Sequence, residues 1–507
     1  MRTDLRAKSA AGIALLGWAL AFLSAGPCCA VRAQDLEKSN ATQGAQPATQ
    51  TTKGLVLKNK APVNKEILNV KLPRPREVTL KNGLRVALLE HHRSPTFVMR
   101  MVFMSGGFSD PPDRRGLAQH TATLLREGTT NRTSRQIAEQ LDSLGTILFG
   151  NAGTSSFISF VTASGQAEKF DQILEIFTDV IRNPSFPADE LAKYSARTVS
   201  QYEVMKSDPD FLAAERFNQA LYGGHPASLI VPPIDALKKT TPAELARFHA
   251  THYRPNNAVL LIVGDVTLTE LLPKIERAFG DWKSAPVPKA VTPPVPAQPA
   301  ARIHLVDRPD SVQTVIHLGN LAIERKHPDY FPLLLMDRII GGPSGRLFNN
   351  LREDKGYTYG VGSYFTGSNY PGFWLTTTSV RTEVTEDAMR EFLYEFKRMR
   401  EEKVTPEELE NAKRSLTGKF ALSLELPQAL LQNIFTQKIF DLPDDYWDTY
   451  SSKVFSVSRE DIQAAARKYI NLRDLQVVAV GDASKIHRAL EKYGAVETSG
   501  GKQAGVK

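Results

Sequence analysis

The stretch Gly341–Tyr364 reads GGPSGRLFNNLREDKGYTYGVGSY and decides the fold of the second half of this chain. Its glycines permit a tight turn, because glycine adopts backbone conformations that other residues avoid. Ser344 is placed to cap the helix that follows. The helix carries Arg352, and a strand is expected to begin near Tyr359, seven residues further on. The stretch therefore predicts a turn, a helix and a strand, in that order.

The chain on either side of this stretch repeats its own pattern. Residues 78–107 and 301–320 each open one half of the chain and are rich in β-forming side chains. Residues 253–266 and 470–483 close the halves, each with a buried-strand pattern that runs into Gly-Asp. This order predicts an α+β fold of two homologous α/β-sandwich halves. Each half should be a mainly antiparallel sheet with helices on one face, and the halves should form a clamshell with a cavity between them.

A proline-rich break separates the two halves. SAPVPKAVTPPVPAQPA, residues 284–300, favours an extended linker and excludes helix or sheet. The polar stretch before residue 71 has the composition of a flexible lead-in. The predicted organisation is a signal peptide (1–33), a flexible lead-in (34–70), an N-terminal domain (71–283), the linker (284–300), a C-terminal domain (301–490) and a flexible tail (491–507).

The first residues have the pattern of an export signal. A cationic start precedes the apolar run AAGIALLGWALAFLSAG, and small side chains favour cleavage after Ala33. An uncleaved membrane anchor is the alternative, although the run is short for a span. Both cysteines, Cys28 and Cys29, lie in this segment, and Pro27 makes lipidation of Cys28 a poor match. The mature chain is expected to be soluble in a bacterial periplasm, with no membrane span and no cysteine for disulfides, thiol catalysis or zinc.

Composition narrows the choice of partners. With 507 residues, 42% of them hydrophobic and 23% charged, the chain is long enough for several domains and typical of globular proteins. The net charge of +8 is modest, and lysines and arginines are interspersed with acidic residues. The sequence lacks a basic stripe with interleaved aromatic residues, which argues against a nucleic-acid partner.

A second informative stretch is Arg114–Gly145, RRGLAQHTATLLREGTTNRTSRQIAEQLDSLG. It resembles the signature region of the pitrilysin-like zinc metallopeptidases, the family of the insulinases and the mitochondrial processing peptidases. Members carry an inverted motif, H-x-x-E-H, whose two histidines bind zinc while the glutamate activates the bound water. In the matching register Gln119 replaces the first histidine, Ala122 the glutamate and Thr123 the second histidine. All three key positions are lost.

Neighbouring residues do not restore the motif. A shifted register that makes His120 a ligand puts Thr123 and Leu124 at the other two positions. The family's third ligand is a glutamate on a later helix, and Glu203 lies near the expected place. One carboxylate cannot hold zinc alone, and the other histidines lack the cysteine or carboxylate neighbours of a metal site. We therefore expect no metal or other cofactor in this chain.

The C-terminal signature is intact by contrast. Gly341–Tyr364 closely matches the family, in which an arginine and a tyrosine at this spacing reach the zinc site of the opposite half. There they bind the substrate backbone and stabilise the negative oxygen of the tetrahedral intermediate. The resemblance implies these roles for Arg352 and Tyr359. The alternative is a local salt bridge of Arg352 with Glu353 or Asp354 and simple packing of Tyr359.

The resemblance, which covers roughly residues 72–490, also implies a division of labour. Some members are heterodimers in which one chain keeps the zinc motif and its homologous partner supplies only the Arg/Tyr pair. By this resemblance the chain is a non-catalytic subunit of an exported zinc-dependent endopeptidase, inactive alone, with zinc in the partner subunit.

Such a subunit would help to enclose an unfolded peptide. Residues 149–161, FGNAGTSSFISFV, are a candidate edge strand for peptide capture, or else a plain sheet strand. The alternative functions are a non-proteolytic scaffolding or peptide-binding protein of the same fold, and an independent peptidase with an unconventional metal site.

Overall fold

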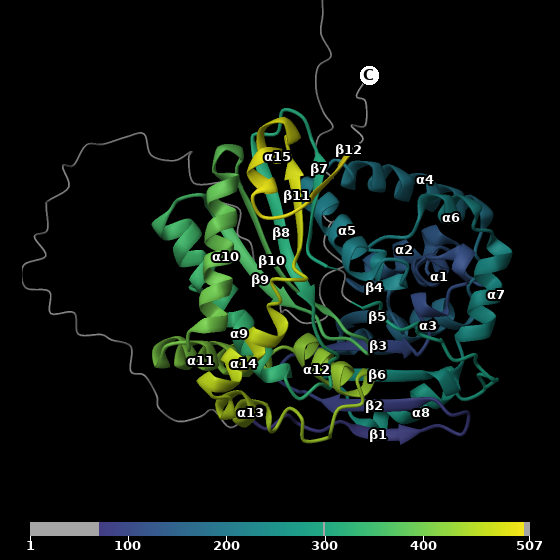
Figure 1. Ribbon diagram of the computed structural model, residues 1–507. Coiled ribbons are helices and arrows are strands. Elements are labelled where there is room, and N and C mark those ends of the chain that lie inside the picture. The colour runs from purple at the N-terminus through teal and green to yellow at the C-terminus, as the bar shows by residue number, and fades with distance from the viewer. Residues whose placement is uncertain (1–69, 298–299, 501–507) are drawn as a thin grey trace, which may run out of the picture. The chain divides into compact units, whose positions relative to one another are not determined.

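The computed structural model of the protein describes residues 70–297 and 300–500 (Figure 1). The predicted signal peptide, residues 34–69 of the lead-in and residues 501–507 of the tail lie outside the described residues. The first half contains β1 (Arg76–Thr79), β2 (Arg85–Glu90), β3 (Thr96–Phe103), α1 (Leu117–Leu124), α2 (Ser134–Ser143), β4 (Ile147–Ala152), β5 (Ser159–Gln166), α3 (Phe170–Arg182), α4 (Ala188–Met205), α5 (Pro209–Tyr222), α6 (Ile234–Lys239), α7 (Pro242–His252), β6 (Ala258–Gly264) and α8 (Leu268–Phe279).

The second half follows the same order of elements. It contains β7 (Arg302–Asp307), β8 (Gln313–Leu321), α9 (Tyr330–Gly341), η6 (Phe348–Asp354), β9 (Thr358–Phe365), β10 (Phe373–Arg381), α10 (Thr385–Glu401), α11 (Pro406–Ser423), α12 (Pro427–Ile439), α13 (Tyr450–Ser456), α14 (Arg459–Tyr469), β11 (Gln476–Gly481), α15 (Ala483–Glu491) and β12 (Val496–Gly500). Residues 284–297, between the halves, form neither helix nor strand.

Each half builds one six-stranded sheet, and the two sheets have matching topology. The strand orders are β1-β2-β6-β3-β5-β4 and β12-β7-β11-β8-β10-β9. In the first sheet only β2 and β6 pair in parallel, whereas in the second β7 is parallel to both β11 and β12. All other neighbouring strands are antiparallel. The predicted fold class, α+β with two homologous and mainly antiparallel sandwich halves, is confirmed.

The end of the chain differs from its predicted boundary. Residues 491–507 were expected to form a flexible tail, but Val496–Gly500 form β12, which pairs in parallel with β7 at the sheet edge. Four of its five residues are exposed, so the strand lacks the apolar alternation that marks buried strands. The C-terminal half therefore continues to Gly500.

The two halves exchange one helix each. The equivalent helices α5 and α12 do not pack on their own sheets: α5 contacts β8 and β11, and α12 contacts β3 and β6 (Figure 1). Alternate residues of β2 show the effect, since Val86 and Leu88 face the first half's own helices while Ala87 and Leu89 belong to a cluster shared with the second half. Own helices therefore cover one face of each sheet, as predicted, and a helix of the other half covers the opposite face.

Apolar side chains fill this junction between the halves. Phe217 of α5 is fully buried against the second sheet, and Phe435 of α12 is buried against the first. A fully buried phenylalanine contributes about 1.5–3 kcal/mol through the hydrophobic effect. The exchanged helices therefore hold the two halves together as one packed body.

A half-buried arginine accompanies each exchanged helix. Arg100 of β3 donates to Gln432 of α12 at 3.1 Å, and its guanidinium lies between the rings of Phe160 and Phe435. Burial lowers the pKa of Arg100 to about 10. In the other direction Arg216 of α5 lies 2.9 Å from the imidazole Nδ1 of His304 in β7. Polar contacts thus fix the register of both exchanged helices.

Candidate functional site

The helix that carries the degenerate zinc motif, α1, is held tightly at its N-terminus. Asp110 accepts hydrogen bonds from the backbone N–H groups of Gly116 and Ala118, both at 2.7 Å. Gly116 has φ of 101°, and a side chain there would collide with Pro232. Burial raises the pKa of Asp110 to about 7, although the backbone hydrogen bonds oppose the shift. The orientation of α1 is therefore set by its surroundings.

The three motif positions of α1 form a closed surface. Ala122 is fully buried, and its carbonyl oxygen lies so close to β4 that a side chain at Gly150 would collide with it. Gln119 and Thr123 are half-buried. The Gln119 side-chain oxygen is buried and has no hydrogen-bond partner among the described residues. The structure thus presents an amide, a methyl and a hydroxyl at these positions.

These groups do not fit a zinc ion. Zinc in proteins is held by imidazole, thiolate or carboxylate ligands, and none of the three positions supplies one. Within residues 70–297 and 300–500, no cluster of three or more His, Cys, Asp or Glu side chains could hold a metal ion. No step of a metal-dependent reaction can be derived from the residues of α1.

The position opposite α1 is occupied by hydroxyl groups of α4. The Tyr194 side chain lies beside those of Thr198 and Thr123, between the two helices. Burial raises the pKa of Tyr194. Glu203, near the place expected for a third ligand, is exposed on the other side of α4 and has no such contact. Tyr194 and Thr198 were not predicted, although their spacing of four residues, continued at Tyr202, marks one buried helix face.

His120 is a packed histidine. Its side chain is fully buried, its ring lies edge-on to Tyr194 with centroids 5.8 Å apart, and its Nδ1 lies 3.4 Å from the Thr240 hydroxyl. Burial lowers the pKa of His120 to about 4. The imidazole is therefore neutral at physiological pH and part of the core.

Arg352 and Tyr359 lie together at the edge of the second sheet. The Arg352 guanidinium lies 5.1 Å from the centre of the Tyr359 ring and 4.8 Å from that of Phe348. Tyr359 is 90% exposed, so the alternative in which it simply packs is wrong. Arg352 does approach Glu353 at 3.6 Å, but an exposed ion pair of this kind contributes little to stability. The pair is thus free to meet another molecule.

A β-bulge presents Tyr359. The pairing of β9 with β10 shifts between Thr378–Val361 and Val380–Thr358, which leaves one extra residue in β9. The Thr358 hydroxyl lies 2.8 Å from the Gly360 carbonyl oxygen and accepts from the Gly360 N–H at 3.0 Å. The Thr378 hydroxyl donates to the same carbonyl at 2.9 Å. Bulges re-aim side chains at sheet edges, and these buried hydroxyls hold this one in place.

The turn that leads to the pair has the expected glycines but a different helix start. A side chain at Gly341 would collide with Ser363 of β9, so the close approach requires glycine. Ser344 does not cap the helix, because the N-cap residue is Leu347 and no side chain caps it. The helix, η6, is π-helical, a form that is rare and frequent at functional sites.

The two candidate sets lie on different sheets. The motif positions of α1 pack on β4, the edge strand of the first sheet, and the Arg/Tyr pair belongs to the edge of the second. No hydrogen bond or ion pair between the two sets occurs in the part of the chain that the structure describes. The structure therefore does not bring them together within one chain.

The predicted peptide-binding stretch, residues 149–161, is an edge strand only in part. β4 is the edge of the first sheet, whereas β5 lies between β4 and β3. On β4, Ile147 is 66% exposed and Phe149 41% exposed. These two side chains share one face of the strand and leave an apolar edge open.

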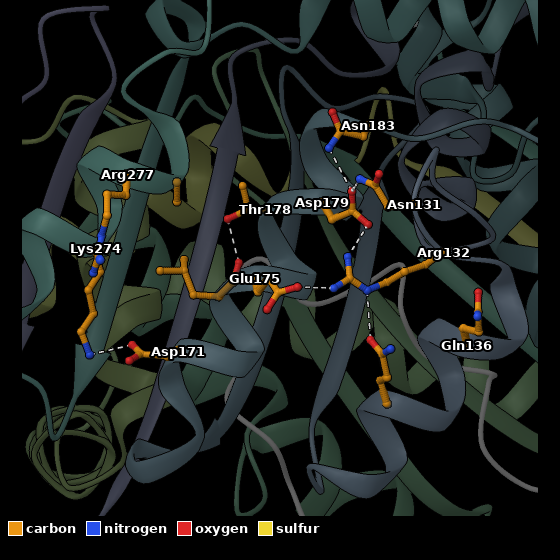
Figure 2. A pocket seen from close by; sticks show the side chains of 13 residues that line it. Asn131, Arg132, Gln136, Asp171, Glu175, Thr178, Asp179, Asn183, Lys274 and Arg277 are labelled. Atoms are coloured by element: carbon orange, nitrogen blue, oxygen red, sulfur yellow. Dashed lines mark hydrogen bonds and ion pairs between the residues drawn. The ribbon is translucent and has the colours of Figure 1, made fainter.

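The first half also contains a polar cavity of about 910 Å³ among α2, α3 and α8. Figure 2 shows that Arg132 reaches both Asp179 and Glu175. Lys274 pairs with Asp171 at 2.6 Å on the far side. These ion pairs join the helices, and each of the three carboxylates that line the cavity lies within ion-pair distance of a cation.

Comparison with known proteins agrees with this picture. A family model described as insulinase, peptidase family M16, matches residues 85–231, and one described as the peptidase M16 inactive domain matches residues 239–416. The chain is 24% identical to an uncharacterized zinc protease, YmxG, of Bacillus subtilis over 68% of this chain and 84% of that protein. It is 23% identical to the non-peptidase homolog YmxG of Helicobacter pylori over 78% of this chain and 91% of that protein.

Solved structures share the fold of both halves. A crystal structure of the peptidase M16 inactive domain from Pseudomonas fluorescens superimposes with a TM-score of 0.73 at 27% identity. The match covers 80% of this chain and 98% of the other. Among the described residues, none of the helices has the length and apolar character needed to cross a bilayer.

Proposed function

This chain belongs to the pitrilysin-like peptidase family M16 and has an inactive zinc motif, and from this premise we propose that it is the non-catalytic subunit of a heterodimeric zinc-dependent endopeptidase. Its homologous partner would keep the zinc motif. One observation carries the proposal: the Arg352 guanidinium stacks on the ring of Tyr359, which is 90% exposed, while the motif positions of the same chain carry no zinc ligand.

The chemistry of the pair supports a role at a partner's site. A tyrosine hydroxyl and a guanidinium both donate hydrogen bonds, and donors aimed at developing negative charge are a large source of transition-state stabilisation. Placed beside a peptide bond in the partner, Tyr359 and Arg352 would hold the substrate backbone and its negative oxygen. The zinc and the base that activates water would be the partner's.

The packing of the halves supports the need for a second chain. The exchanged helices fill the junction between the halves with apolar side chains, so a chamber that encloses an unfolded peptide would form against the partner. The open edge of β4, with Ile147 and Phe149, would line that chamber and add a substrate strand. Export to the periplasm is proposed from the apolar run at residues 10–26.

The test is reconstitution with a homologous chain that has an intact H-x-x-E-H motif. We expect cleavage of an unfolded peptide by the mixture and none by this chain alone. Arg352→Ala or Tyr359→Phe should lower kcat/KM about 10²–10³-fold, the effect of removing one such donor. Arg135→Ala and Tyr394→Phe are matched controls, since both residues are exposed, at 86% for the Arg135 side chain and 54% for Tyr394.

Two outcomes would overturn the proposal. An active mixture that is indifferent to both substitutions would favour a scaffolding or peptide-binding role. Stoichiometric zinc and cleavage by the purified chain alone would favour an independent peptidase with an unconventional metal site.

A further inference from the structure

A second cavity, of about 650 Å³, lies in the second half beside the start of α9. It is bounded by the segment before α9, by the loop between α12 and α13, and by residues at the end of α13. Its lining combines aromatic and proline side chains with basic ones. The basic residues are Arg325, Lys326, His327 and Lys453, and Tyr330 and Tyr446 are among the aromatic residues. This volume falls within the range of small-ligand sites, about 300–1,000 Å³.

Arg325 is a buried cation without an acidic partner. Only 8% of the residue is exposed, and its guanidinium stacks 3.9 Å from the centre of the Tyr330 ring and 5.3 Å from that of Tyr446. Among the described residues it makes no salt bridge, and its Nε has no hydrogen-bond partner. Burial lowers the pKa of Arg325, while Tyr446 and Tyr450 oppose the shift. A guanidinium nevertheless stays protonated in proteins, so the charge remains.

The acidic groups of this cavity are already engaged. Asp441 pairs with Lys326 at 2.8 Å. Asp461 accepts from both the backbone N–H and the hydroxyl of Ser458, at 2.8 and 2.7 Å, as part of a helix cap. Lys453, like Arg325, makes no ion pair in the described part of the chain and lies over the Tyr446 ring at 5.2 Å.

The contrast with the cavity of the first half is informative. There Arg132 pairs with Asp179 at 2.7 Å and also contacts Glu175, and the cavity is lined by as many carboxylates as lysines and arginines (Figure 2). The second cavity is lined by two cations without an ion pair, Arg325 and Lys453, and by one such carboxylate, Asp461. One positive charge is therefore in excess. Leaving a buried charge unpaired is costly, and an anion bound from solution would remove that cost.

We propose that this cavity binds a carboxylate group carried on a small apolar or aromatic body. The planar fork of a guanidinium matches a carboxylate in shape, and the single excess charge matches a monoanion better than a phosphate dianion. The rings of Tyr330, Phe331 and Tyr446, with Pro332 and Pro443, would hold the apolar part. A free organic acid and the C-terminus of a peptide offer the same chemistry. The inference does not depend on the proposed peptidase partner.

The test measures binding of two matched probes to the full chain by calorimetry. N-acetylphenylalanine has the carboxylate, and N-acetylphenylalaninamide is its neutral equivalent. We expect the acid to bind at least ten-fold more tightly than the amide, and Arg325→Met to abolish this difference. Lys397→Met is the control, since Lys397 is exposed on α10 and does not line the cavity. Equal binding of both probes, or binding of neither, would overturn the proposal.

Two further measurements separate ligand binding from a structural role. Without ligand, Arg325→Met should leave the melting temperature unchanged or raise it, because it removes an unpaired buried charge. A large loss of stability with no difference between the probes in the wild type would show that Arg325 only holds the aromatic rings. A peptide ending in phenylalanine, with a free or an amidated C-terminus, then distinguishes a free organic acid from a peptide C-terminus as the natural ligand. Tighter binding of N-acetylphenylalanine indicates a free acid, and tighter binding of the peptide with a free C-terminus indicates a peptide; both results support the proposal.

Discussion

The edge strands β4 and β9 hold the same place in two equivalent sheets, yet their surroundings are opposite. At β4 the helix with the degenerate zinc motif is packed: Ala122 is fully buried and Thr123 lies beside Tyr194. At β9 Tyr359 is 90% exposed on a bulge. Folding explains the first arrangement, because it fills a core. It does not explain the second, since an exposed tyrosine on an irregular strand adds little stability. The exposed Tyr359 on its bulge, which folding does not require, is therefore the feature that points to function.

The strongest way to break this comparison is to reopen the first site. Ala122→Glu restores the glutamate of the motif but places a carboxylate at a fully buried position. We expect a loss of about 3–5 kcal/mol in the free energy of unfolding, the cost of an uncompensated buried charge. Urea denaturation followed by circular dichroism measures it, with Gln136→Glu on the exposed face of α2 as the control. A stable Ala122→Glu protein would show that the site is still open.

A second comparison uses the buried carboxylates beside the equivalent helices α1 and α9. Burial raises the pKa of Asp337 on α9 to about 7, although hydrogen bonds from Ser363 and Trp374 and the charge of Arg338 oppose the shift. The unfolded value is 3.8, so between these values the folded state binds more protons. The contribution of Asp337 to stability is therefore present below pH 3.8 and is lost as pH rises towards 7.

Asp337→Asn mimics the protonated form and should remove this dependence. Between pH 5 and pH 7.5 the variant should gain about 2–3 kcal/mol relative to the wild type, following the linkage relation. Urea denaturation at both values measures the difference. Asp110→Asn at α1 should behave in the same direction, because burial also raises the pKa of Asp110 to about 7. If the difference in the free energy of unfolding between Asp337→Asn and the wild type is the same at both pH values, the pKa of Asp337 is not raised by folding.

The bulge offers a smaller perturbation on the open side. Thr378→Val keeps the volume but removes the hydroxyl that donates to Gly360 and Thr358. The Gly360 carbonyl oxygen keeps the Thr358 hydroxyl at 2.8 Å, so the loss of the Thr378 hydroxyl should cost about 1 kcal/mol in the free energy of unfolding. In the reconstituted peptidase Thr378→Val should also lower kcat under conditions in which the variant remains folded, since the bulge that positions Tyr359 has lost one of its hydroxyls. Thr376→Val, a buried hydroxyl on the same strand that donates to Leu318, is the control for stability without effect on Tyr359.

The smallest expected effect concerns Tyr359 itself. Tyr359→Ala should change the free energy of unfolding by no more than about 0.5 kcal/mol, because substitutions at exposed positions away from caps and cores are nearly neutral. Thermal denaturation of the purified chain measures it. A loss above 2 kcal/mol would mean that the tyrosine is structural, and the contrast between the two edges would disappear.

Much of the architecture could be predicted from the sequence because its signals are local. The all-buried strands β6 and β11 are continuous apolar runs that end in glycine, and their repetition reveals two halves. The neighbourhood of Arg352 and Tyr359 follows from a short turn–helix–strand segment. Residues that depend on long-range contacts were missed. Tyr194 meets Thr123 across about seventy positions of sequence, and no local pattern encodes that contact.

The destination of the exchanged helices was equally hidden. The apolar face of α5 or α12 says that the helix packs on a sheet, but not on which sheet. β12 was missed for a different reason. Four of its five residues are exposed, so the sequence has no apolar pattern there, and the strand forms by backbone pairing with β7. In both cases contacts with distant parts of the chain, and not local sequence preference, determine the structure.

The reciprocal exchange of α5 and α12 also determines how the chain must fold. Each half, made alone, would lack the helix that covers one face of its sheet and would carry a helix with no sheet to cover. The two halves therefore complete each other in the manner of complementing fragments, and unfolding should be a single cooperative transition. A cut in the extended linker at residues 284–297 would leave a nicked but associated protein, whose two pieces could part only by unfolding together.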